Sequence, residues 1–354
     1  MTAPLRYVAA TCALVLAARL AVGQTLPKTL AITGAPKCAN CGVRLQEIAT
    51  LGSYVVGSAK VEINAYAYDR KRKLAYVRGA SRTEIDAYSL DGKVQFTVGF
   101  HDRRPPAGAR DDAFAVGPGD SLWVLDPNQQ RVTIYTPGTA TAARSFRVNA
   151  HIERILPAKD GQFVGISSKP AADTPDRMLV HVFSADGKSV HALGAPASTG
   201  SVRPAVGLSR TATMVWIGRP DSYTLELWGL DGKQVSTVHR AASWFTPDAV
   251  AKAKRAHRSP PAITDLYEDD FGVLWVTGQR PDPTFVPRPA KGAAMLQSEL
   301  LNVLEVLNVS EQKIEYADDI GQPLYRLGAD YFVEPNVRDR VATWRVVKVS
   351  IVKR

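Results

Sequence analysis

The carboxylate and histidine side chains best suited to chemistry in this sequence are Glu62, Asp112, His151, Glu153 and Asp265. Carboxylate oxygens and imidazole nitrogens are common ligands of divalent metals. No two histidines stand in H-x-x-x-H spacing, and the nucleophile-elbow, phosphate-loop and dinucleotide-binding patterns do not occur. These side chains could therefore form a site only if the fold brings them together. A divalent metal is one alternative. The default is that no cofactor is present and that they are hydrogen-bonded structural groups.

Further polar and aromatic residues lie where a ligand could reach them. Asp126 and Asn128 follow an apolar strand, although a turn explains this pair equally well. Arg203 precedes another predicted strand. The candidate ligand-binding residues are Asp112, Asp126, Asn128, His151, Arg203, Trp244, Phe245, His257, Arg258 and Asp265.

Residues 240–261 form the most individual insertion. Thr246 can cap a helix, Pro247 suits its first position, and Asp248 complements its positive end. One interpretation is a short surface helix anchored by Trp244 and Phe245. The other is a lid in which Arg255, His257 or Arg258 meets an anionic ligand.

Residues 1–23 have the layout of a secretory signal, with an apolar stretch followed by small residues before Gln24. We expect an exported chain, periplasmic or extracellular, with a retained anchor as the alternative. Removing Arg6 and Arg19 lowers the formal net charge from +10 to +8. No later segment could cross a membrane. The chain has no dense basic run with interleaved aromatics, so we expect no nucleic-acid partner. We expect a monomer.

Two cysteines remain after residue 23, Cys38 and Cys41, in Cys-x-x-Cys spacing. Two thiolates alone cannot complete a tetrahedral zinc site. In an oxidising compartment this pair predicts a local disulfide within an N-terminal tether, residues 24–42. A redox-active or inter-chain role is the alternative.

An internal repeat determines the fold class. Aromatic residues at 88, 183 and 228 each stand three positions before an Asp-Gly-Lys turn, and Tyr135 begins a diverged copy. Successive copies are 47, 48 and 45 residues apart. Asp-Gly favours a tight hairpin, and short apolar strands precede each copy. Repeats of four strands and this length are typical of β-propeller blades.

The count predicts an all-β, six-bladed propeller of four-stranded antiparallel blades over residues 43–354. Its inner strands should begin near Val61, Asp112, Ile152, Arg203, Ile263 and Pro323. The last repeat offers only three strands, and Val43–Leu51 should supply the fourth and close the ring. His181 is in phase with Asp86, Thr133 and Glu226 on third strands, and we expect it to be exposed.

The segment from Ile263 to Val276 resembles the blade signature of two-component-regulator propellers. The chain as a whole resembles six-bladed propellers of the NHL and TolB-like kinds. That resemblance implies a fold shared by lactone hydrolases, lyases and pure interaction modules, and it does not choose among them.

Long insertions collect on one predicted face, at about residues 99–111, 167–177, 240–261 and 278–300, whereas the other face has short turns. Insertions of this kind usually mark a binding face. The turn Glu268-Asp269-Asp270 falls on the opposite face and is interpreted as turn chemistry.

Two functions remain open. The first is an exported binding module that recognises a protein, peptide, glycan or small anionic ligand through the loop-rich face and channel mouth. The alternative is a metal-dependent lactonase-like or lyase-like enzyme with weak candidate ligands Glu62, Asp112, Glu153 and Asp265.

Overall fold

The computed structural model describes most of the chain. The described residues are 28–55, 63–79, 84–99, 114–168, 178–196, 203–255, 258–284, 300–320, 324–328, 330–338 and 341–354. Several predictions above concern residues outside these ranges: the signal-like residues 1–23, Val61, Glu62, Asp112, His257, Pro323 and most of the insertions at 99–111, 167–177 and 278–300.

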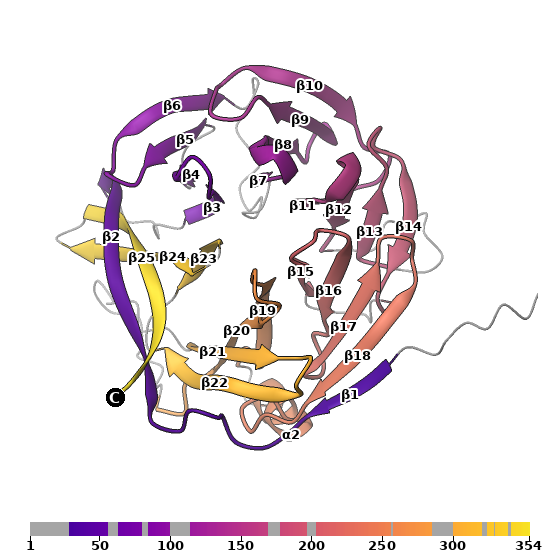
Figure 1. Ribbon diagram of the computed structural model, residues 1–354, viewed down its shortest axis with the longest axis vertical. Helices are drawn as coiled ribbons and strands as arrows, with labels where there is room; N and C mark the ends of the chain where they lie inside the picture. The colour runs from indigo at the N-terminus through magenta and orange to yellow at the C-terminus, as the bar shows by residue number, and fades with distance from the viewer. Residues whose placement is uncertain are drawn as a thin grey trace, which may run out of the picture.

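Six four-stranded antiparallel sheets are arranged as blades around a central axis, so the chain is a six-bladed β-propeller (Figure 1). Blade 1 consists of β3 (Ile63–Asp69), β4 (Leu74–Gly79), β5 (Glu84–Ser89) and β6 (Val94–Gly99). Blade 2 consists of β7 (Phe114–Val116), β8 (Leu122–Asp126), β9 (Arg131–Tyr135) and β10 (Ala142–Arg147). Blade 3 consists of β11 (Arg154–Pro157), β12 (Phe163–Ile166), β13 (Val180–Phe183) and β14 (Ser189–Leu193).

The second half of the ring follows the same order from the inner to the outer strand. Blade 4 consists of β15 (Ala205–Leu208), β16 (Met214–Gly218), β17 (Thr224–Gly229) and β18 (Gln234–Arg240). Blade 5 consists of β19 (Ala262–Glu268), β20 (Leu274–Pro281), β21 (Leu300–Asn308) and β22 (Lys313–Ile320). Blade 6 consists of β23 (Tyr325–Gly328), β24 (Tyr331–Arg338), β25 (Val341–Lys353) and β2 (Cys41–Val55).

The ring is closed by the N-terminal strand, as the sequence predicts. β2 pairs antiparallel with β25, with Val43 opposite Ile351 and Leu51 opposite Trp344. The N-terminal segment also does something that the repeat does not indicate. β1 (Lys28–Ile32) pairs parallel with β18 and adds a fifth strand to blade 4. The segment predicted as a tether therefore follows the outer edges of blades 4 to 6 (Figure 1).

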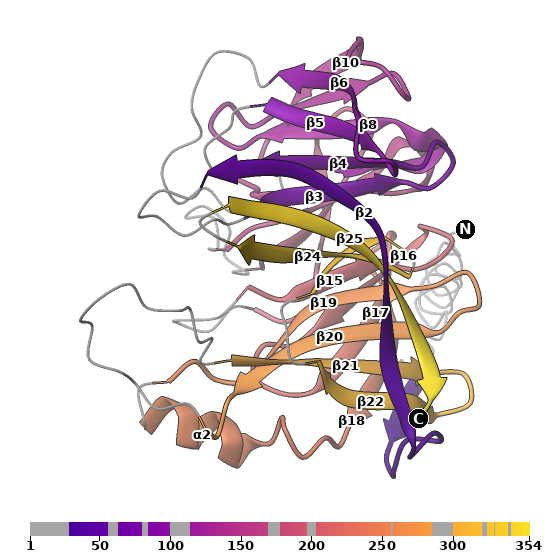
Figure 2. The same ribbon diagram turned by 90° about the vertical axis from the view of Figure 1, so that its left-hand side faces the viewer.

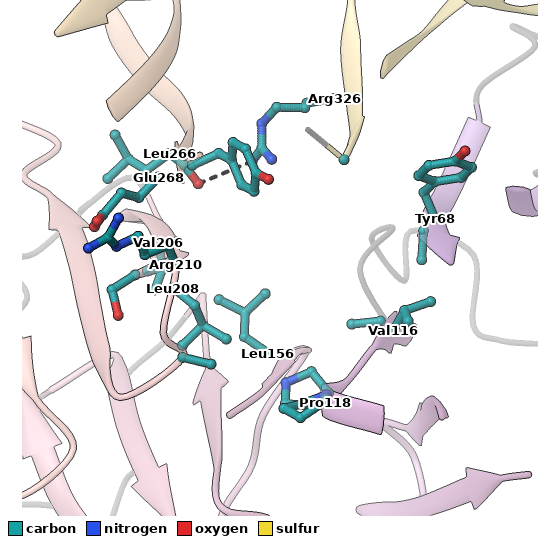
Figure 3. Close-up of a pocket in the computed structure, with 18 of the residues that line it drawn as sticks. Tyr68, Val116, Pro118, Leu156, Val206, Leu208, Arg210, Leu266, Glu268 and Arg326 are labelled. Carbon is teal, nitrogen blue, oxygen red and sulfur yellow. Dashed lines mark hydrogen bonds between the residues drawn. The ribbon is translucent and has the colours of Figure 1, made fainter. Parts of the chain in front are cut away.

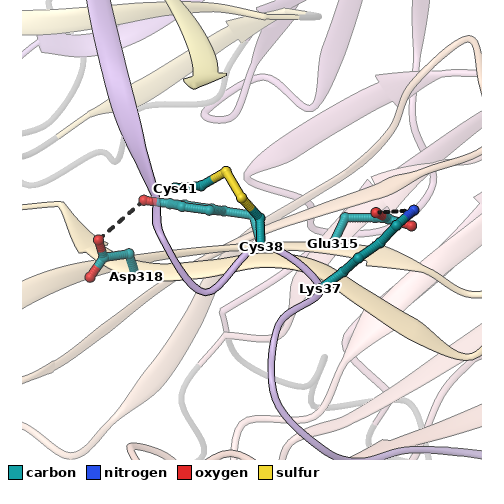
Figure 4. The surroundings of a disulfide bond; sticks show 6 residues. Lys37, Cys38, Cys41, Glu315 and Asp318 are labelled. Carbon is teal, nitrogen blue, oxygen red and sulfur yellow. Dashed lines mark hydrogen bonds and ion pairs between the residues drawn. A yellow bond between two sulfur atoms is a disulfide. The ribbon is translucent and has the colours of Figure 1, made fainter. Parts of the chain in front are cut away.

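The disulfide between Cys38 and Cys41 lies where this segment passes from blade 5 to blade 6 (Figure 4). Next to it, the Lys37 amide donates to the carbonyl of Ile314 at 2.8 Å, and the Lys37 ammonium lies 3.2 Å from Glu315. The Arg354 amide donates to the Asn40 carbonyl at 2.8 Å. The disulfide loop is therefore attached both to β22 and to the end of β25.

Apolar side chains form six separate clusters, one between each pair of neighbouring blades. Between blades 6 and 1, for example, Trp344 packs with Val77 and Tyr88. Each blade is stabilised by two neighbours, because burial of apolar area between sheets is the main favourable term in folding. Leu30 and Ile32 of β1 join the cluster between blades 4 and 5.

The Asp-Gly-Lys copies form the turns that the sequence predicts. Gly92, Gly187 and Gly232 have φ values of 82°, 87° and 82°, which L side chains rarely adopt. At Gly187 an added Cβ would also overlap the Arg147 carbonyl. These glycines set the length of the outer hairpins in blades 1, 3 and 4.

The prediction that His181 is exposed on its third strand is wrong. Asp86, His181 and Glu226 are buried rather than exposed, with exposed fractions of 4%, 7% and 2%. The reason is that these side chains lie between blades, where a period-two pattern cannot distinguish solvent from a polar blade interface. Each is hydrogen-bonded there: Asp86 accepts from Thr97, His181 contacts the Met178 carbonyl, and Glu226 accepts from Arg219 and Trp228.

The insertion after blade 4 contains the helix α2 (Pro247–Arg255), whose start follows the predicted pattern. The Ala249 amide donates to Thr246 Oγ1 at 3.1 Å. Phe245 is buried in the cluster between blades 4 and 5. The helix lies at the outer rim of the ring rather than over its centre (Figures 1 and 2). This placement supports the anchored surface helix. No helix in the described ranges is long and apolar enough to cross a membrane.

Buried tyrosines give a first testable prediction. Burial raises the pKa of Tyr68, Tyr76 and Tyr316 to about 12. Because the folded pKa lies above the unfolded value of about 10, their contribution to stability is complete below pH 10. It is lost as pH rises towards 12. Absorbance at 295 nm and the thermal midpoint, followed together from pH 8 to 12, should show late tyrosine ionisation coincident with unfolding. Ionisation of all tyrosines near pH 10 in the folded protein would contradict this.

Candidate functional site

A cavity of about 710 Å³ occupies the centre of the ring. It is lined by all six inner strands, β3, β7, β11, β15, β19 and β23, and it reaches the turns between first and second strands. Arg70, Pro118, Lys159, Arg210 and Asp270 of those turns form its outer part. We call this cavity the channel. Figure 3 shows Tyr68, Val116 and Pro118 on one side of it and Val206, Arg210 and Glu268 on the other.

Two arginines share one aspartate inside the channel. Arg326 of blade 6 donates through Nη2 to Asp265 Oδ2 of blade 5, and through the same atom to the Leu266 carbonyl at 3.1 Å (Figure 3). Arg154 of blade 3 lies 3.5 Å from Asp265 Oδ1. The three side chains are only 10%, 16% and 18% exposed in the order Arg326, Arg154, Asp265. The cluster holds two positive charges and one negative charge in a partly desolvated position.

One aromatic ring contacts Arg326, and other tyrosines line the channel. The Arg326 guanidinium lies 4.3 Å from the centre of the Tyr267 ring, a cation–π geometry. Tyr66 contacts Tyr325, with ring centres 5.9 Å apart, and Tyr68 contacts Tyr331 at 5.2 Å. Burial raises the pKa of Tyr68 to about 12 and raises that of Tyr267. These phenols therefore stay neutral near pH 7 and can donate hydrogen bonds.

The turn Glu268-Asp269-Asp270 performs the turn chemistry expected of it. Asp269 Oδ1 accepts from the amides of Phe271 and Val273 at 2.9 and 3.0 Å, and its other oxygen accepts from Trp275. Glu268 and Asp270, on either side of Asp269, also line the channel. The sequence did not suggest this location.

The candidate residues from the sequence are distributed over several places. Asp265 lies in the channel, and His151 and Glu153 lie close to one another, 3.7 Å apart. Asp126 accepts from the amides of Asn128 and Gln129, so this pair forms a turn. Arg203 is half-buried just before β15. These six side chains do not form one cluster.

The remaining candidates lie in or beside the α2 insertion. Trp244 donates to Glu305 at 3.2 Å, and Phe245 is packed against it. Arg258 donates to the Asp282 carbonyl at 2.6 Å. These contacts anchor the insertion to blade 5.

The sequence did not predict Arg154, Arg326 or the channel tyrosines Tyr66, Tyr68 and Tyr267. Arg154 directly follows the candidate Glu153. A predicted strand register that is wrong by one residue therefore selects Glu153 in place of Arg154. Shifts in register interrupt the inner-strand pairing of β3, β19 and β23, which a strict alternation cannot anticipate. The signal available in advance was the position of Arg326 within the last predicted inner strand.

The metal alternative has little support from the described residues. Within the described ranges, no three His, Cys, Asp or Glu side chains are grouped so that they could hold a metal ion. Asp265, the channel carboxylate among the candidate ligands, lies between two guanidinium groups, which would repel a cation. Glu62 and Asp112 lie outside the described ranges.

No protein-family model and no curated protein sequence matches the chain. Solved structures show the fold. A Bacteroides fragilis protein assigned to the exported class is similar with a TM-score of 0.58 and 11% identity, over 92% of this chain and 99% of that one. A DUF4221-family member from Bacteroides vulgatus gives 0.56 and 11%, over 88% and 99%. Virginiamycin B lyase from Staphylococcus aureus gives 0.48 and 9%, over 88% and 100%.

Proposed function

We propose that this chain is an exported binding module that holds a small organic anion in its central channel. The observation that carries the proposal is the convergence of Arg154 and Arg326 on a single carboxylate, Asp265, inside the cavity. Likeness to a Bacteroides protein assigned as exported supports the export part, together with the signal-like residues 1–23.

The charge balance favours an anion over a cation. Each guanidinium carries a full positive charge at every pH of interest. The partial burial of these groups strengthens their interaction with a ligand charge, because the effective dielectric is lower than in water. A carboxylate or phosphate group beside Arg326 would therefore be attracted to its guanidinium, whereas a cation there would be repelled.

The donors of Arg326 favour an anionic group. Arg326 uses Nη2 for both of its hydrogen bonds within the described part of the chain, so Nη1 and Nε remain for a ligand. Hydrogen bonds from a guanidinium to a carboxylate are charge-assisted and stronger than neutral ones, and Tyr267 holds the plane of this guanidinium in place. Tyr68 and Tyr267 offer neutral donors and ring faces to the body of the ligand.

Replacing Arg326 with Gln should weaken binding of a carboxylate by about ten- to a hundredfold, because a charge-assisted hydrogen bond is removed. The probes are octanoate and benzoate, titrated calorimetrically at low salt into the wild-type protein and the variant. Arg354→Gln is the matched control, because Arg354 pairs with Asp318 on the outer surface and is 70% exposed.

Equal affinities of wild type and Arg326→Gln for both probes would overturn the anion site, as would failure of the wild type to bind either probe. The metal-dependent alternative gains support from a stoichiometric divalent ion in the purified protein that is lost on Asp265→Ala. Circular dichroism of each variant checks that the blades are intact.

A further inference from the structure

The disulfide between Cys38 and Cys41 is separate from the channel and lies on the segment that follows the outer edges of the blades (Figures 1 and 4). Both cysteines are half-buried, and Ala39 and Asn40 between them are exposed. Thiols that react with external partners occupy partly exposed positions of this kind, whereas fully buried cysteines are inert. The pair is therefore open to attack by another thiol.

The disulfide contributes little to holding this segment in place. It joins residues only three positions apart, and the loop entropy that a disulfide removes from the unfolded chain grows with the length of the loop. The same segment is fixed without the sulfur atoms. The Lys37 amide donates to a carbonyl of blade 5, and the Arg354 amide donates to the Asn40 carbonyl, both at 2.8 Å. Breaking the S–S bond therefore leaves the attachment to blades 5 and 6 intact.

The two sulfur atoms have different surroundings. Cys41 begins β2, where it lies opposite Lys353, and it packs against the apolar cluster between blades 5 and 6. Cys38 precedes the strand in the loop and is not part of that cluster among the described residues. An external thiol therefore reaches Cys38 more easily than Cys41.

We propose that Cys38 and Cys41 form a reversible thiol–disulfide exchange site, in which Cys38 meets the partner and Cys41 is the resolving cysteine. The partner supplies two thiols, as a protein dithiol of the Cys-x-x-Cys kind or as two molecules of a small thiol. The proposal is independent of the anion site, because the two share no residue.

The exchange balances in thiols and electrons. A partner thiolate attacks Cys38 Sγ and forms a mixed disulfide, while Cys41 Sγ leaves with the electron pair of the broken S–S bond and takes up a proton. The second partner thiolate then attacks the partner sulfur of the mixed disulfide, and Cys38 leaves as a thiolate that takes up the second proton. Two electrons and two protons thus pass to this pair, and the partner becomes a disulfide. The reverse sequence oxidises the pair.

Equilibration with glutathione at graded ratios of reduced to oxidised form, and separately with reduced thioredoxin, tests the exchange. Alkylation of the free thiols and mass spectrometry of the peptide that contains both cysteines measure the reduced fraction. We expect complete and reversible conversion in the folded protein, followed by circular dichroism. The thermal midpoints of the two forms should differ by less than about 2 °C.

The two reagents separate the possible partners. Reduction by glutathione identifies a small thiol as sufficient, and reduction by thioredoxin alone identifies a protein dithiol as the partner. A structural disulfide stays oxidised in the presence of glutathione. A pair that resists both reagents until the blades unfold therefore refutes the exchange site.

Single substitutions test the assigned roles. Cys41→Ser leaves the thiol of Cys38, and Cys38→Ser leaves that of Cys41; both variants also carry Cys12→Ser, so that one thiol remains in the full chain. The Cys38 thiol should react with dipyridyl disulfide at least about tenfold faster than the Cys41 thiol, because it is the more accessible sulfur. Cys41→Ser should also accumulate a mixed disulfide with glutathione, since the resolving sulfur is missing. Equal rates, or a faster reaction at Cys41, would show that the roles are assigned wrongly.

Discussion

Glu305→Ala is expected to lower the free energy of unfolding by about 3–5 kcal/mol, because it leaves a buried guanidinium without its partner. Glu305 is 1% exposed on β21 of blade 5. It accepts from Arg240 Nε at 3.0 Å, from the Tyr223 hydroxyl at 2.8 Å, and from the Trp244 indole at 3.2 Å. One carboxylate thus connects blade 4, blade 5 and the base of α2.

Equilibrium unfolding in urea measures this change. Glu311→Ala is the matched control, since Glu311 follows the same strand, is 51% exposed, and pairs only with Lys313 in the described structure. It should change stability by less than about 0.5 kcal/mol. The double change Glu305→Leu with Arg240→Met should recover most of the loss, because apolar side chains of similar volume can replace a buried ion pair. A loss below about 1 kcal/mol for Glu305→Ala would refute the assignment.

Gly207→Ala is expected to cost about 2–4 kcal/mol and to weaken anion binding at the same time. Gly207 lies on β15 of blade 4, and an added Cβ would overlap the carbonyl oxygen of Leu266 on β19 and lie 2.7 Å from its carbon. Main-chain atoms cannot move aside as a flexible side chain can. The inner strands of blades 4 and 5 would have to separate.

The link to the channel comes from the same carbonyl, because the Leu266 oxygen accepts from Arg326 at 3.1 Å. Displacing it should misplace the guanidinium. Gly99→Ala is the control: Gly99 has no positive φ and nothing within 4 Å of an added Cβ, so stability should change little or rise slightly. Urea unfolding and octanoate titration on both variants measure the two effects. Wild-type behaviour of Gly207→Ala in both would contradict the close approach of the blades.

The fold could be predicted because the sequence of one blade recurs along the chain, at spacings of 45 to 48 residues. The predicted inner-strand starts Val61, Asp112, Ile152, Arg203, Ile263 and Pro323 lie within two residues of the observed starts of β3, β7, β11, β15, β19 and β23. The missing outer strand of blade 6 followed from the need to remove an open edge. β1 gave no comparable signal, because five residues that pair in parallel with a strand some 200 positions later carry no local pattern.

The site was predictable only in part. Asp265 was a candidate for its carboxylate, and the structure places it in the channel with Arg154 and Arg326. A search based on metal-ligating residue types does not look for arginines, and the pairing of Asp265 with Arg326 joins residues 61 positions apart. A charge cluster of this kind depends on the closed ring, since blades 3, 5 and 6 each supply one of its three side chains.

The closure of the ring by β2 and β25 also has a kinetic consequence. Val43 is made early in synthesis, yet its partner Ile351 is added some 300 residues later. Closing so long a loop carries a large entropic cost before any contact offsets it, and distant pairings slow folding. We therefore expect five blades to assemble as an open arc first, with the union of the two chain ends as the final, rate-limiting event.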